Sequence, residues 1–183
     1  MSSALFGSAD GASSGEPSLT ASAVVAQTVG SHILRIDGYS RTKRRGNGKC
    51  FDSDTFFVGG HCWRMQYYPD GLDERYSGSI SIFLRLDYPI YGVSEVIAKF
   101  RISLLDKNGN PVPSYTCNME PHAFSIERGG HRAFGYEGLI CHIDLERSDY
   151  LKEDVFSVRC DVTVPVREIV TKAIPVSAVC RGV

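Results

Sequence analysis

Thiols and imidazoles are the side chains of this chain that are best suited to catalysis or metal binding, since both can act as nucleophiles or bases and both ligate zinc. Six cysteines and five histidines are present, and two adjacent pairs occur among them, His61-Cys62 and Cys141-His142. Neighbouring strand residues point to opposite faces, so neither pair chelates an ion easily. The chain also lacks the Cys-x-x-Cys pairs of a structural zinc site. The spacing therefore predicts neither a metal site nor a cofactor.

Catalytic motifs are absent from the sequence as well. It contains no Gly-x-Ser-x-Gly, no His-Glu-x-x-His, no phosphate-binding glycine loop and no dinucleotide-binding glycine motif. A cysteine hydrolase would need a thiolate beside a histidine and an orienting acid, which sequence alone does not decide. We expect reduced, mostly buried thiols and no catalytic residues, so the chain is predicted not to be an enzyme.

Composition places the chain among ordinary globular proteins. Apolar residues make up 43% of its 183 residues and charged residues 22%, with a formal net charge of -1. Such a charge provides no general attraction to nucleic acids or acidic membranes. The sequence has neither a long apolar run nor a secretory signal pattern. We therefore expect an intracellular protein, in the cytoplasm or nucleus, without nucleic-acid or membrane partners.

One aromatic residue stands out against the strand that contains it. From Ile80 to Tyr88 the even positions are apolar and the odd positions are polar, except for Phe83. This alternation is typical of a half-buried strand. Phe83 would then lie on the open face, where it is either covered by another element or presented to a partner peptide.

The segments around this strand show the same period. An aromatic strand (Trp63, Met65, Tyr67) ends in a Pro69-Asp70-Gly71 turn, and strands are predicted at His32–Ile36, Ala98–Leu105 and Phe156–Val166. Short one-sided strands between turns predict an all-β protein, an antiparallel β-sandwich. The clearest helical stretch runs from Asp144 to Leu151.

Composition also suggests domain limits. Residues 1–27 are rich in Ser, Ala and Gly and are expected to form a disordered leader. Residues 28–168 would form the domain, and 169–183 a tail. Near its start, Arg41–Lys49 carries five basic residues in a predicted loop. This segment is a nuclear import signal, a nucleic-acid patch or a solvated loop.

Several strings together resemble one family over residues 28–168. They are GKCFDSDTFFVGGHCWRMQYYPDG, SISIFLRL, VIAKFRISLLD and EDVFSVRCDVTV, in that order. Their sequence and spacing are similar to those of the MATH (meprin and TRAF homology) domain, and most similar to the plant proteins that join it to a BTB domain. The resemblance implies a TRAF-like antiparallel β-sandwich with one or two short helical turns.

The resemblance also implies a shallow groove for short peptides. By motif, its aromatic residues match Phe83, Phe100, Phe124 and Phe134. Phe100 shares its strand face with core residues, so packing competes with a groove role. Arg132 stands where the family usually has Trp, and its guanidinium favours an acidic or hydroxylated ligand.

The implied function is recognition of substrate proteins without catalysis. In the family, the MATH domain holds a peptide motif of a target, and a BTB domain docks onto a cullin-based E3 ubiquitin ligase. That BTB domain is not part of this chain, so 169–183 would be the tail towards it. The alternative is a stand-alone MATH interaction protein, a competitor or scaffold with no link to a ligase.

Overall fold

The computed structural model describes residues 22–89 and 92–170. The chain divides into two compact units. One comprises 1–24 and 167–183, of which only the strand ends 22–24 and 167–170 are described. The other, Val25–Val166, contains every feature discussed below. Most of the expected leader and tail therefore lies outside the described residues. The first strand begins at Ser22, before the expected domain start at Thr28.

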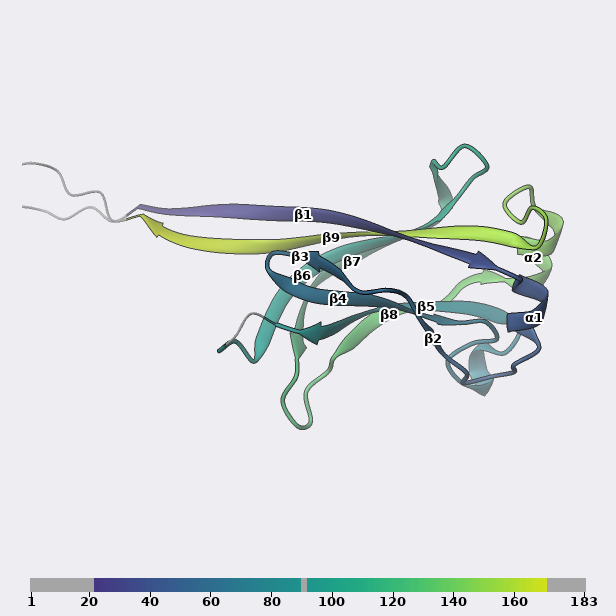
Figure 1. Ribbon diagram of the computed structural model, residues 1–183, viewed down its shortest axis with the longest axis horizontal. Helices are drawn as coiled ribbons and strands as arrows, with labels where there is room; N and C mark the ends of the chain where they lie inside the picture. The colour runs from purple at the N-terminus through teal and green to yellow at the C-terminus, as the bar shows by residue number, and fades with distance from the viewer. Residues whose placement is uncertain (1–21, 90–91, 171–183) are drawn as a thin grey trace, which may run out of the picture. The chain divides into compact units, whose positions relative to one another are not determined.

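Two β-sheets make up the larger unit (Figure 1). The four-stranded sheet has the order β1-β9-β6-β7, formed by β1 (Ser22–Asp37), β9 (Val155–Val170), β6 (Glu95–Leu105) and β7 (Pro111–Ser125). The other sheet has the order β2-β4-β5-β8, formed by β2 (Phe51–Asp52), β4 (His61–Tyr68), β5 (Ser79–Tyr88) and β8 (Ala133–Cys141), and β3 (Phe56–Val58) also pairs with β4. Short helical segments are α1 (Tyr39–Lys43), α2 (His142–Arg147) and a 3-10 turn (Glu74–Tyr76). The predicted all-β architecture is confirmed.

The inward faces of both sheets contribute to one apolar core. Alternate residues of β5, β6 and β9 are buried there, as the period-two pattern predicted: Ile80, Ile82, Leu84, Leu86, Ala98, Phe100, Ile102, Leu104, Val158, Cys160 and Val162. The Trp63 indole is fully buried and lies edge-on to Phe124, with ring centroids 5.0 Å apart. Its Nε1–H donates to Val58 O at 3.1 Å, so the one polar atom of this side chain is satisfied.

The predicted turn after β4 is present and depends on its glycine. Gly71 has φ 82°, and a Cβ there would fall 2.3 Å from Tyr76 O. Only glycine combines this conformation with so close an approach. His142 Nε2 lies 2.7 Å from Pro69 O, which links the turn to α2. The turn sets where β5 begins, and hence which face each of its side chains takes.

Two local expectations were wrong, and a predicted helix is present with different limits. Tyr88 was placed on the buried face of its strand, yet it is 73% exposed. The register between β4 and β5 shifts beside it, and buried Asp87 is held there by Arg64 and Arg85. The helix predicted at 144–151 is α2, which ends at Arg147.

The second error concerns the basic segment, expected to be a loop throughout. Its first residues belong to α1, which Tyr39 anchors because its side chain is buried and its hydroxyl donates to Glu146 Oε1 at 2.9 Å. Tyr39 precedes the basic segment, so the composition of Arg41–Lys49 alone did not indicate that α1 is fixed by this contact.

Replacement of Val162 by Asp tests the register of β9. Val162 is fully buried, so Val162→Asp should leave an unpaired carboxylate in the core and cost at least about 3 kcal/mol of unfolding free energy. Thr163→Ala, on the opposite face, should cost less than about 0.5 kcal/mol. Urea unfolding of both variants measures the contrast. Equal losses would contradict the assigned faces.

Candidate functional site

Strand β8 lies at the edge of its sheet, with β5 as its partner. The Leu86 N–H donates to Arg132 O at 2.9 Å, at the start of this pairing. Backbone groups alternate along an antiparallel pair, so Phe134 faces β5, whereas Ala133 and Gly135 present their N–H and C=O groups to the other edge. An edge strand with such groups is a template for pairing with a further extended chain.

Phe83 lies beside this edge on the outer face of the sheet. Its neighbours Ile82 and Leu84 are fully buried, so its own side chain points away from the core and is half-buried. The ring packs edge-on against Tyr68, with centroids 5.7 Å apart. Phe83 pairs with Gly135, where an added Cβ would lie 2.7 Å from Phe83 Cγ. The missing side chain leaves the ring accessible from the edge strand.

Phe134 lies on the opposite face of the same sheet. It pairs with buried Leu84 and therefore points inward, at the open margin of the sandwich. Its half-buried ring packs edge-on to Phe124 at 4.9 Å and lies 4.5 Å from the ring of His122 and 5.8 Å from that of His131. The structure thus brings Phe83 and Phe134 to one edge but on two faces.

The other two matched aromatic residues belong to the core. Phe124 is completely buried and Phe100 is 3% exposed, and their ring centroids are 5.9 Å apart. The Phe124 ring is closed off from the surface in this structure, whereas Phe100 contributes to the lining of a surface hollow on the four-stranded sheet. Phe124 instead supports Phe134 from beneath. Contact of Phe100 and Phe124 with a peptide stays a prediction, and we build the proposed site on Phe83 and Phe134.

Arg132 comes directly before β8 and is exposed. Its Nη2 donates to Ile126 O at 3.2 Å, which holds the guanidinium near the β7–β8 connection. Within the part of the chain that the structure describes, no carboxylate lies within ion-pair distance of Arg132. Its charge is thus available to a ligand at the end of the free edge where Phe134 lies.

Sequence reasoning missed a hollow further along this edge. It measures about 480 Å³ and is lined by Tyr76, Met119, Gly135, Tyr136, Glu137 and Gly138. Tyr136 lies two residues beyond Phe134, so the period of β8 could have identified it. Interaction with Tyr136 partly offsets the rise in the pKa of the Cys117 thiol of β7 that burial causes.

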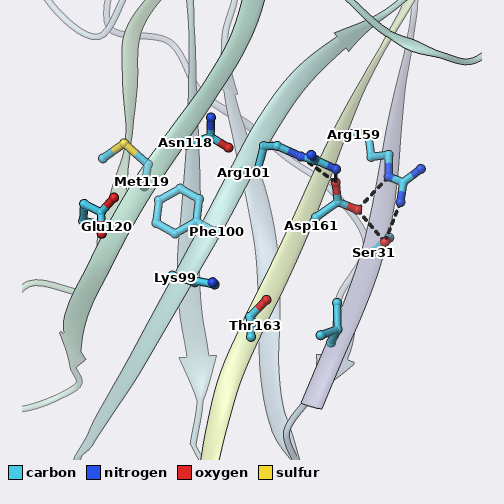
Figure 2. Close-up of a pocket in the computed structure, with 11 residues that line it drawn as sticks. Ser31, Lys99, Phe100, Arg101, Asn118, Met119, Glu120, Arg159, Asp161 and Thr163 are labelled. Atoms are coloured by element: carbon cyan, nitrogen blue, oxygen red, sulfur yellow. Dashed lines mark hydrogen bonds and ion pairs between the residues drawn. The ribbon is translucent and has the colours of Figure 1, made fainter. Parts of the chain in front are cut away.

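A second hollow, of about 470 Å³, lies on the outer face of the four-stranded sheet (Figure 2). At one side Asp161 accepts hydrogen bonds from Ser31 Oγ at 2.6 Å, Arg101 Nη2 at 2.7 Å and Arg159 Nε at 2.7 Å. Partial burial raises the pKa of the Asp161 carboxyl, but these three hydrogen bonds outweigh burial and lower it. The carboxylate joins side chains of β1, β6 and β9, so its role is in holding the sheet.

Two of the thiols in the described part of the chain are disfavoured as nucleophiles. Burial raises the pKa of Cys117 and Cys160, which disfavours the reactive thiolate. The expectation of mostly buried thiols holds for Cys62 and Cys160, but Cys50 and Cys141 are exposed. The described residues contain no group of three or more ligating side chains that could hold a metal ion. Nor, in that same part of the chain, is any helix long and apolar enough to cross a membrane.

Comparison with known proteins identifies relatives of this fold. The family model described as "MATH domain" matches residues 31–162. BTB/POZ and MATH domain-containing protein 4 of Arabidopsis thaliana is 38% identical over 84% of this chain and 33% of its own length. Protein 5 of the same name series and organism is 38% identical over 82% of this chain and 37% of its own length. The chain spans about a third of these curated relatives.

Among solved structures, TRAF5 of Notothenia coriiceps superimposes with a TM-score of 0.52 over 83% of this chain and 77% of that chain. The two sequences are 17% identical. At this identity the match shows a shared fold, the TRAF-like β-sandwich, and says nothing about ligands.

Replacement of Asp161 by Asn tests the network on the four-stranded sheet. Because folding lowers the Asp161 pKa, its ionisation stabilises the fold above the ordinary carboxyl pKa of about 3.9 and ceases to do so as pH falls through the lowered value. Asp161→Asn should cost about 1–2 kcal/mol at neutral pH and show a weaker loss of stability on acidification. Urea unfolding across the acid range measures both. Identical pH profiles for variant and parent would contradict this role.

Proposed function

Because the chain belongs to the MATH domain family, we propose that it recognises short extended peptides of partner proteins without catalysis. The observation that carries this proposal is the free edge of β8, with Phe83 on one face and Phe134 on the other. A peptide strand adding to that edge gains backbone hydrogen bonds from Ala133 and Gly135. Phe83, Phe134 and Arg132 then supply contacts that select its side chains.

The position of the two rings on opposite faces defines a rule for the peptide. Successive side chains of an extended strand point to opposite faces. A residue that touches Phe83 and a residue that touches Phe134 must therefore be separated by an odd number of positions. Apolar residues at consecutive positions satisfy this condition, whereas apolar residues two apart do not.

The ligase link rests on the relatives. The two Arabidopsis proteins carry BTB/POZ in their names as well as MATH, and this chain covers about a third of each. We propose residues 28–168 as the recognition domain, with bound proteins passed to a cullin-based ubiquitin ligase through a BTB domain outside these residues. A stand-alone competitor or scaffold is the alternative. Co-purification of a cullin with the complete gene product separates the two.

Removal of the Phe83 ring should weaken binding and leave the fold intact. Phe83 is half-buried on an outer face, so Phe83→Ala should reduce affinity for a peptide selected by display against this domain by about 1–3 kcal/mol. Fluorescence anisotropy measures the affinity and thermal unfolding the stability. A full loss of a core aromatic would instead cost about 3–5 kcal/mol of folding stability.

Two controls sharpen this experiment. Phe124→Ala removes a buried ring and should lower the unfolding temperature much more than Phe83→Ala. Phe134→Ala should reduce both affinity and stability, because its ring contacts Phe124 as well as the open margin. If Phe83→Ala bound the peptide normally but melted early, Phe83 would be a packing residue and not a contact residue.

Reversal of the Arg132 charge tests ligand selection at the end of the edge. Arg132 is exposed and hydrogen-bonds only a carbonyl in the described part of the chain, so Arg132→Glu should lower affinity for acidic peptides. We expect a loss of about 1 kcal/mol that shrinks with added salt, because exposed charges are screened. Affinity for a glutamine-substituted peptide should be unchanged. An equal loss for both peptides would exclude an electrostatic role.

A further inference from the structure

The segment from Arg41 to Lys49 carries a cluster of positive charge that is not part of the proposed site at the free edge of β8. Lys43 is neutralised, since its Nζ lies 2.6 Å from Glu146 Oε1. Among the described residues, no carboxylate lies within ion-pair distance of the remaining four cations, which we call the basic loop: Arg41, Arg44, Arg45 and Lys49. All four are exposed. By contrast, the arginines of the strands are paired with aspartates, as at Arg64, Arg85, Arg101 and Arg159.

The backbone of the basic loop is anchored at both ends. At its start, Asp154 accepts hydrogen bonds from the backbone N–H and the hydroxyl of Ser40, both at 2.8 Å. At its end, Asn47 Nδ2 donates to Asp70 O at 2.8 Å, and the Gly48 N–H donates to Gly71 O at 3.0 Å. The four charges are therefore held on an ordered backbone, which lowers the entropy lost when a partner binds.

A hollow beside these charges includes an aromatic side chain. It measures about 310 Å³ and is lined by Arg45, Lys49, Cys50 and Phe51. Phe51 is half-buried and packs on Tyr67, with ring centroids 6.1 Å apart. Two cations and an apolar ring around one hollow suit a ligand that presents carboxylates next to an apolar side chain.

We propose that the basic loop is a second docking surface, for an acidic segment of a partner protein with an apolar residue among its carboxylates. Nucleic acid fits less well, because its affinity comes mainly from the number of phosphates that cations neutralise, and the loop offers four cations. The net charge of -1 adds no attraction to polyanions elsewhere. This surface adjoins β2, whereas the proposed peptide site lies at the free edge of β8, at the other end of the strand order β2-β4-β5-β8. The two surfaces are thus separate sites.

The test is a double charge reversal, Arg44→Glu with Arg45→Glu, in the full chain. The probe is a labelled synthetic peptide in which leucines stand among glutamates. The unaltered chain should bind it with an affinity that falls as salt is added, and the double variant should bind about tenfold more weakly or worse. Lys99→Glu with Lys107→Glu, which reverses two exposed cations elsewhere, should retain binding.

Further controls distinguish binding at this surface from binding at the free edge of β8 and from binding of nucleic acid. Phe83→Ala should leave binding of the acidic probe unchanged, and a loss of affinity in this variant would show that the probe occupies the free edge of β8. The proposal is overturned if the glutamine version of the peptide binds equally well, or if the control pair loses as much affinity as the loop pair. It is also overturned if a labelled DNA duplex binds more tightly than the peptide.

Discussion

The alternation of side chains across β5 is the constraint on which the proposed site depends. Ile82 and Leu84 are buried in the shared core, so Phe83 between them must face outward. The same strand aligns β8, where pairing with Leu84 turns Phe134 inward. A slip of one residue would exchange these faces and bury Phe83. Core packing therefore sets where both proposed contact rings lie, although neither ring is itself at the centre of the core.

The polar groups that stabilise the β-sandwich are different from the polar groups that a partner could bind. On the four-stranded sheet, Asp161 binds two arginines and a serine, so those charges are already satisfied. At the free edge of β8, backbone groups remain unpaired with another strand, and in the described chain the guanidinium groups of Arg132 and of the basic loop have no carboxylate partner. Binding there need not break an existing contact. This contrast is why we place recognition at the edges of one sheet and not on the outer face of the other.

Much of the fold followed from the sequence because burial has a clear period in β5, β6 and β9. The turn at Gly71 and the outward face of Phe83 followed from the same local rules. The sequence left undecided whether Phe100 is buried in the core, and it did not indicate that Phe124 is buried. The resemblance to the family does not specify how deeply each ring lies. Tyr88 and α1 depend on long-range contacts, Asp87 with Arg64 and Tyr39 with Glu146, which periodicity does not encode. The role of Tyr136 required knowledge of which strand lies opposite it.

Amide hydrogen exchange along β8, with and without a bound peptide, tests the central claim most directly. Ala133 and Gly135 present their amides to the free edge, so these should exchange rapidly in the unbound chain and become protected when a peptide strand pairs there. Phe134, whose amide faces β5, should be protected in both states. The account predicts this alternating response. Saturating peptide that left the exchange of Ala133 and Gly135 unchanged would contradict strand addition at β8.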